Sequence, residues 1–123
     1  MKKKYDGVII GAGPAGIFTA LELAEKNPRM KTLIIDKGRT IEKRVCPARE
    51  KGHCLNCDPC GITSGWSGAG AFSDGKLSLS PEVGGRMTDY MSPEAAREGI
   101  NYADKIYLKF GAQEKVYGLD EKR

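Results

Sequence analysis

The sequence is poor in the side chains that most often carry acid–base catalysis. His53 is its only histidine, and neither a nucleophile–histidine–acid triad nor a pair of closely spaced carboxylates stands out. The sequence alone therefore identifies no catalytic residue, so its functional signals must come from binding motifs.

Long hydrophobic runs are also absent. The longest candidate for a membrane span, the uncharged run over residues 7–21, is flanked by Asp6 and Glu22 and is shorter than the roughly 18 residues that indicate a membrane-spanning helix. Three lysines precede it, as in a secretory signal, but Asp6 and the glycines and proline inside the run interrupt its apolar core. We therefore expect a cytoplasmic protein that does not associate with membranes.

A strong excess of one charge is lacking as well. Twenty Lys and Arg residues stand against sixteen Asp and Glu residues, a net charge of +4 that is spread along the chain and does not indicate nucleic-acid binding. Hydrophobic residues make up 40% and charged residues 29%, which excludes a compositionally disordered chain. The 123 residues correspond to one domain at most.

The first 36 residues predict a strand, a helix and a second strand. Residues 5–10 form a short apolar run rich in β-branched side chains, typical of a strand covered on both faces of a parallel sheet. Residues 17–26 carry apolar side chains at helical spacing, and Pro14 suits the first turn of this helix. Residues 32–36 give the second strand. The pattern predicts an α/β fold with a parallel sheet, built on a βαβ unit over residues 5–36.

The remaining chain changes character several times. Residues 37–60 are rich in charges, cysteines and prolines and predict a loop. Residues 61–75 form a glycine-rich loop, and residues 76–80 alternate apolar and polar side chains as a short half-exposed strand does. Ser92 suits the cap of a second helix over residues 92–110.

A glycine-rich motif joins the first strand to the helix, and an acidic residue ends the second strand. The motif is Gly11-Ala12-Gly13-Pro14-Ala15-Gly16, and Asp36 lies twenty residues after it. In this setting the G-x-G-x-x-G pattern is typical of dinucleotide binding. The alternative is a glycine turn in an α/β domain that binds nothing.

Each glycine of this motif has its own physical role. Gly11 permits a tight turn, Gly13 lets the backbone approach a pyrophosphate, and Gly16 allows the helix to pack closely on the sheet. The pyrophosphate would meet free amides and the positive end of the helix dipole. Asp36 could accept hydrogen bonds from the adenosine ribose, and its charge disfavours a 2′-phosphate, although Lys37 and Arg39 leave room for one.

Two stretches resemble a known protein family. Residues 5–16, YDGVIIGAGPAG, resemble the opening of glutathione-reductase-like FAD flavoproteins. Residues 65–77, GWSGAGAFSDGKL, together with residues 46–50, CPARE, and the cysteines after them, narrow the resemblance to the FAD-dependent dehydrogenases of bacteria and archaea. The resemblance covers residues 4–85.

The resemblance implies a Rossmann-like FAD/NAD(P)-binding fold and a flavin-dependent oxidoreductase of unknown substrate. The residues implied to bind the ADP half of FAD are Gly11, Gly13, Pro14, Ala15, Gly16, Asp36 and Lys37. Those implied to lie nearer the flavin are Gly68, Ala69, Gly70 and Ser73, with Arg44 also reaching the cofactor. Family members are much longer than this chain, so the resemblance implies a partial FAD-binding domain over residues 1–123, without the segments that complete the flavin pocket and bind substrate.

Without the resemblance, the loop over residues 61–75 has two interpretations. Its exposed amides can form an anion-binding nest, and Trp66 and Phe72 could lie against a planar ring. A plain loop, with Trp66 as a core anchor, explains the same residues equally well.

All four cysteines lie within fifteen residues of loop sequence, at Cys46, Cys54, Cys57 and Cys60. Four thiolates at this spacing could bind zinc or an iron–sulfur cluster, and His53 could replace one ligand. A redox-active Cys54–Cys57 or Cys57–Cys60 pair is the second possibility, and cysteines without a special role are the third. A disulfide framework is not expected in a cytoplasmic chain.

Three functions remain open at this point. The first is the FAD-binding part of a flavin-dependent oxidoreductase, the second a small NAD-binding module, and the third a non-enzymatic metal-binding fragment. A two-stranded sheet leaves unpaired strand edges. We therefore expect the isolated chain to associate with itself or with a complementing chain, or to bind FAD weakly.

Overall fold

The computed structural model describes residues 3–116 and divides into two compact units at Gly75. In the first unit, strand β1 (Gly7–Ile10), helix α1 (Pro14–Lys26) and strand β2 (Thr32–Ile35) follow one another. The two strands form a parallel sheet in which Gly7 is opposite Thr32 and Ile10 is opposite Ile35. The predicted α/β unit with a parallel sheet is therefore present, and its size suits the N-terminal piece of a Rossmann-like domain.

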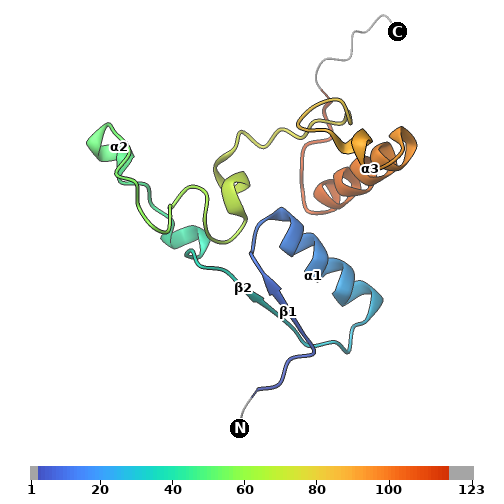
Figure 1. Ribbon diagram of the computed structural model, residues 1–123, viewed down its shortest axis with the longest axis horizontal. Coiled ribbons are helices and arrows are strands. Elements are labelled where there is room, and N and C mark those ends of the chain that lie inside the picture. The colour runs from blue at the N-terminus through green and yellow to red at the C-terminus, as the bar shows by residue number, and fades with distance from the viewer. Residues whose placement is uncertain (1–2, 117–123) are drawn as a thin grey trace, which may run out of the picture. The chain divides into compact units, whose positions relative to one another are not determined.

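Helix α1 begins and ends where local chemistry dictates. Pro14 occupies its first position, where the missing amide hydrogen has no intrahelical partner to lose. The helix ends at Lys26, and the amide of its C-cap Asn27 donates to the Leu23 carbonyl at 2.8 Å. Between these ends α1 packs against both strands, as Figure 1 shows.

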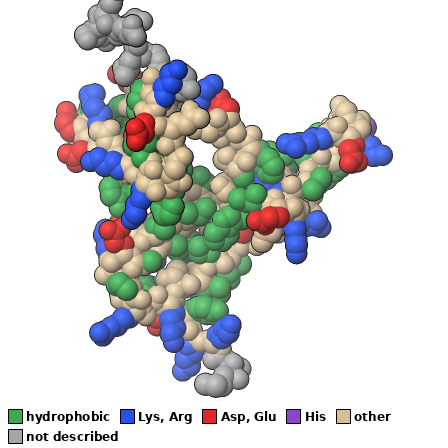
Figure 2. Space-filling view, turned by 180° about the vertical axis from the view of Figure 1, so that it is seen from behind, with side chains coloured by type: hydrophobic (Ala, Val, Ile, Leu, Met, Phe, Trp, Pro, Cys, Tyr) green, Lys and Arg blue, Asp and Glu red, His purple; other side chains and the backbone are tan. Residues whose placement is uncertain are grey.

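Among the described residues, a helix covers only one face of the sheet, which differs from the expectation of strands buried on both faces. Ile9 lies on the covered face, because its side chain would be close to a Cβ placed at Gly16 in α1. Val8 and Ile10 alternate with it and point the other way, and Ile10 is 89% exposed. Ile35, paired with Ile10, is also exposed. Figure 2 shows many hydrophobic side chains on the surface.

The rest of the first unit is irregular chain with three short helical segments. These are η1 (Ile41–Lys43), α2 (Ala48–Lys51) and η2 (Gly68–Phe72). The first two interrupt the predicted loop over residues 37–60, and the third lies in the glycine-rich loop.

The second unit contains η3 (Met87–Asp89) and helix α3 (Pro93–Lys109). Its helix matches the predicted one closely, and the Ser92 hydroxyl accepts a hydrogen bond from the Ala95 amide at 3.2 Å. The predicted strand over residues 76–80 was wrong, since this segment has no regular structure. The alternation that suggested it spans only two apolar side chains, and the structure places no second strand beside it.

Among the helices in the described part of the chain, none has the length and apolar character to cross a bilayer.

Candidate functional site

The glycine motif after β1 forms a turn whose first glycine is required by its backbone conformation. Gly11 has a φ of 104°, in the region that residues with a Cβ rarely adopt. Its amide donates to the Ile35 carbonyl at 2.7 Å, so the turn starts from the last pair of the sheet. The structure therefore gives Gly11 the tight-turn role predicted for it.

Gly16 is required by packing. A Cβ at this position would collide with the carbonyl oxygen of Gly11 and approach the Ile9 side chain at 3.3 Å. The first turn of α1 can therefore lie against the glycine turn and β1 only because residue 16 has no side chain. This is the close helix–sheet approach predicted from the sequence.

Gly13 has neither of these constraints. Its φ of −77° and ψ of −177° are open to any residue, and a Cβ built on it would meet no atom within 4 Å. Gly13 is the N-cap of α1 and makes no side-chain cap, so the first amides of the helix have no partner within the helix. The absence of a side chain here leaves open space beside the positive end of the helix dipole.

Asp36 lies directly after β2 and connects that strand to the glycine motif. One carboxylate oxygen accepts the Ala12 amide at 2.8 Å and the other accepts the Gly38 amide at 2.7 Å. These two hydrogen bonds, helped by the Gly65 amide and the Arg44 charge, hold the pKa of Asp36 below its usual value, while burial acts in the opposite direction. The carboxyl is therefore charged at neutral pH, and sequence reasoning missed its role in holding the turn.

The second glycine-rich loop returns to the first. The Ser67 amide donates to the Ala12 carbonyl at 2.8 Å, and a Cβ at Gly68 would lie 3.3 Å from the Cα of Gly13. Of the residues predicted for the flavin side, Gly68 is thus brought directly against the glycine motif. Nearby, the Trp66 amide donates to the Arg39 carbonyl at 3.1 Å.

The other residues predicted to contact the cofactor do not lie directly against the glycine motif in the contacts that the structure shows. Ser73 is engaged within its own loop, because its amide and its hydroxyl both donate to the Gly70 carbonyl, at 3.2 and 3.0 Å. Ala69 and Gly70 belong to the same exposed turn. Lys37 points to solvent and forms a loose pair with Asp58 at 3.9 Å.

Arg44 organises the second loop from within. Its side chain is buried, with 5% of the residue exposed. The guanidinium donates to the carbonyls of Gly61 at 2.9 Å, Trp66 at 2.6 Å and Gly68 at 2.7 Å, and also to that of Ile62. It lies 4.7 Å from the centroid of the Phe72 ring, within range of a cation–π interaction. The resemblance implied a cofactor contact for Arg44, and the structure gives it a loop-holding role that no sequence pattern distinguished.

The structure does not gather the four cysteines into the predicted metal centre. Within residues 3–116, no group of three or more His, Cys, Asp or Glu side chains is placed to hold a metal ion. Helix α2 separates Cys46 from the later cysteines, and the Cys54 sulfur accepts the Asn56 amide at 3.4 Å. The Nδ1 atom of His53 lies 3.0 Å from the Lys51 carbonyl, and His53 joins no such group.

Cys60 has the most distinctive environment of these thiols. Hydrogen bonds from the amide and hydroxyl of Thr63 and from the amide of Ile62 lower the pKa of Cys60, the Arg44 charge acts in the same direction, and burial opposes them. Cys60 also lines a cavity of about 270 Å³, whose other lining residues include Cys57, Arg39 and Lys43.

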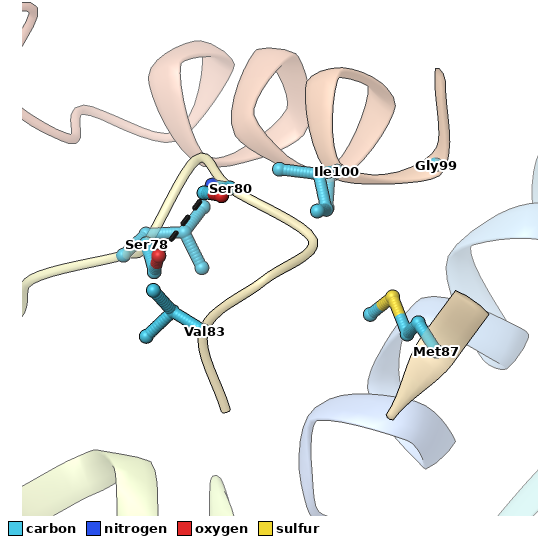
Figure 3. Close-up of a pocket in the computed structure, with 8 residues that line it drawn as sticks. Ser78, Ser80, Val83, Met87, Gly99 and Ile100 are labelled. Carbon is cyan, nitrogen blue, oxygen red and sulfur yellow. Dashed lines mark hydrogen bonds between the residues drawn. The ribbon is translucent and has the colours of Figure 1, made fainter. Parts of the chain in front are cut away.

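A second, mostly apolar cavity of about 310 Å³ lies within the second unit. Figure 3 shows it between the irregular chain that carries Ser78, Ser80 and Val83 and the helix residues Gly99 and Ile100. The Ser80 amide donates to the Ser78 hydroxyl at 3.5 Å.

The first unit is thus an α/β unit with two glycine-rich loops meeting at the carboxyl ends of its parallel strands. The chain is 41% identical over 107 residues to an uncharacterized protein of Clostridium beijerinckii, covering 82% of this chain and 19% of that protein. It is 36% identical over 98 residues to a digeranylgeranylglycerophospholipid reductase of Methanosarcina mazei, covering 74% of this chain and 24% of the reductase.

The chain therefore spans about a fifth to a quarter of the length of these curated relatives. No family model matches it, and no solved structure does.

Proposed function

We propose that the first unit is the ADP-binding part of a flavin-dependent oxidoreductase and that FAD is its dinucleotide. The observation that carries this proposal is the position of Gly13. Backbone conformation explains Gly11 and packing explains Gly16, but within residues 3–116 neither of these constraints requires a glycine at residue 13. A ligand that closely approaches the main chain at the start of α1 supplies the missing reason.

A pyrophosphate fits the chemistry of this position. The first amides of α1 point out of the helix without intrahelical acceptors, and the helix dipole favours negative charge at the same end. Gly68, which lies against Gly13, continues the same side-chain-free surface into the second loop. Both loops can therefore approach a phosphate group through their backbones.

Asp36 can serve a ribose while it holds the glycine turn. An ionised carboxylate has about four acceptor positions. The Ala12 and Gly38 amides occupy two of them, and the Gly65 amide also acts on the carboxylate. The acceptor capacity that remains could serve a ribose hydroxyl. Its negative charge makes a 2′-phosphate an unfavourable neighbour, which favours FAD or NAD over NADP.

The identification of the cofactor as FAD has two supports. The loop sequences resemble those of FAD-dependent dehydrogenases, and one relative of the chain is named as a reductase. When bound, the flavin would supply the hydride or electron chemistry. The residues described here would bind and orient the ADP half, and any group that acts on a substrate belongs to another part of the protein.

The test replaces Gly13 with valine and measures FAD binding by titration calorimetry. We expect FAD affinity to fall at least about tenfold, equivalent to about 1.4 kcal/mol, because the new side chain fills the space left for the pyrophosphate. The thermal midpoint should fall only modestly, because the backbone conformation is ordinary and the Cβ meets no atom within 4 Å, while valine is a poorer N-cap than glycine.

A matched control is Gly99→Val in α3, where a Cβ likewise meets nothing within 4 Å. It should leave FAD affinity unchanged. The proposal would be contradicted if the Gly13 variant bound FAD as tightly as the natural chain. If the natural chain bound NAD more tightly than FAD, the cofactor would be NAD and not FAD.

A further inference from the structure

We propose that Cys60 and Cys57 form a thiol–disulfide exchange site for small anionic disulfides, in which Cys60 attacks and Cys57 resolves. This site is separate from the glycine motif and does not depend on dinucleotide binding.

The first observation is the shared cavity. Cys57 and Cys60 both line the cavity of about 270 Å³ in the first unit, whereas Cys46 and Cys54 do not. Cys60 is partly covered and Cys57 is exposed. A ligand in the cavity therefore lies against two cysteine residues that are three positions apart, the Cys-x-x-Cys spacing of disulfide oxidoreductases.

The second observation is the surroundings of Cys60. The residue opens a tight turn in which the Ser64 amide donates to the Cys60 carbonyl at 3.0 Å. The turn presents the amides of Ile62 and Thr63 and the Thr63 hydroxyl to the sulfur. Such donors favour a negative sulfur, and the thiolate is the attacking form in disulfide exchange. Together with the position of Cys60 on the cavity wall, these donors support Cys60 as the nucleophile.

Cys54 is the natural comparison, because it also has a cysteine three residues away. Its sulfur lies against a single residue, Asn56, accepting the amide at 3.4 Å and facing the side-chain oxygen at 3.6 Å. It does not line the cavity. The structure therefore favours the Cys57–Cys60 pair over the Cys54–Cys57 pair that the sequence left equally open.

The third observation is the charge around the cavity. Its lining includes three basic residues, Arg39, Lys43 and Arg44, against one acidic residue, Asp58. The Arg44 guanidinium is already bound to loop carbonyls, and Asp58 is paired loosely with Lys37. Arg39 and Lys43 are exposed and can attract the carboxylates of a disulfide.

The exchange balances in two steps. The Cys60 thiolate attacks one sulfur of the disulfide R–S–S–R, forming a Cys60–S–S–R bond and releasing one R–S⁻. The Cys57 thiolate, after losing its proton to solvent, then attacks the Cys60 sulfur, which forms Cys57–S–S–Cys60 and releases the second R–S⁻. The protein thiols are oxidised by two electrons, and the disulfide is reduced to two thiols.

The experiment uses the full chain, reduced and treated with a chelator, with glutathione disulfide as the probe. In the natural chain, peptide mass mapping should find an internal Cys57–Cys60 disulfide. Cys57→Ser should accumulate a mixed disulfide with glutathione on Cys60, because the resolving thiol is gone. Cys60→Ser should react at least about tenfold more slowly, equivalent to about 1.4 kcal/mol of activation free energy. Cys54→Ser is the matched control and should behave as the natural chain.

The anionic preference is tested with two further disulfides, cationic cystamine and neutral hydroxyethyl disulfide. For each disulfide, the rate of its reaction with the protein is divided by the rate of its reaction with a small free thiol. This ratio removes the intrinsic reactivity of the disulfide. Glutathione disulfide should have the highest ratio, and salt should reduce its advantage. Equal ratios would overturn the anionic class.

Adducts spread evenly over all four cysteines of the natural chain would overturn the site itself, and this measurement requires no variant. A metal ion that resists the chelator and protects the thiols would overturn it as well.

Discussion

Asp36 is the charged residue that connects the sheet to the glycine motif. Its two oxygens join the end of β2 to the glycine motif through the amides of Ala12 and Gly38. These same bonds lower the pKa of its carboxyl, so folding favours the charged form. A group of this kind stabilises the fold above its unfolded pKa, and the stabilisation disappears as the pH falls through the lower folded pKa.

Replacing Asp36 with asparagine should therefore destabilise the chain in a pH-dependent way. The side-chain nitrogen of asparagine cannot accept a hydrogen bond from a backbone amide, so one of the two hydrogen bonds is lost. The other bond is weakened because its acceptor oxygen no longer carries a negative charge. At neutral pH we expect a loss of about 1–2 kcal/mol in the free energy of unfolding, measured by urea denaturation. Near about pH 3, where the unfolded carboxyl is protonated, the difference should shrink. A difference that is the same at both pH values would contradict this assignment of the charge.

At the residue scale, the sequence predicted conformational roles better than contacts. The roles of Gly11 and Gly16 follow from the absence of a Cβ, a property of the residue itself, and the structure bears both out. The structural role of Asp36 depends on which amides the fold brings to it. The structural role of Arg44 is still harder to predict from the sequence, because its carbonyl partners lie 17 to 24 residues away in an irregular loop.

At the scale of elements, the two long helices were predictable, whereas the short helices η1 and α2 were missed and the strand over residues 76–80 was wrong. Helix α3 has its own signals, with Ser92 as the cap and Pro93 at the first position. A strand, in contrast, is stable only beside a partner, and residues 76–80 have none in the described chain. The cysteines show the same limitation, since the spacing of ligands along a loop does not determine whether the loop folds around a metal.

The loop over residues 61–75 depends on one side chain for its shape. Arg44 binds four of its carbonyls, and a lysine cannot reproduce the planar fork of donors. Arg44→Lys should therefore lower the free energy of unfolding by about 1–3 kcal/mol and speed proteolysis within residues 61–75. Denaturant melts and mass mapping of the cleavage sites measure the two effects.

Arg49→Lys provides the control for this substitution. Arg49 is exposed and lies 5.8 Å from the centroid of the same Phe72 ring, but it donates to none of these carbonyls in the structure. The Arg49→Lys variant should have the same free energy of unfolding as the natural chain. If both variants lose the same stability, contact with the ring and not the carbonyl network would explain the effect of Arg44.

At the scale of the whole molecule, the open face of the sheet is the feature that needs an explanation. Val8, Ile10 and Ile35 lie exposed on the face opposite α1, and a two-stranded sheet has an unpaired edge on each strand. The matched segments make up only 19% and 24% of the two relatives. Apolar surface of this kind is usually covered by further strands or helices.

The isolated chain should therefore self-associate through this face, and Ile10 is the residue to change. Its side chain is 89% exposed, and covering such a group contributes about 1.5–3 kcal/mol. Ile10→Thr should weaken association at least about tenfold, measured by sedimentation velocity over a range of concentrations. Val45→Thr is the matched control, because Val45 is 70% exposed in the same unit but lies outside the sheet. A natural chain that sediments as a monomer at every concentration and melts cooperatively would show that the open face needs no cover.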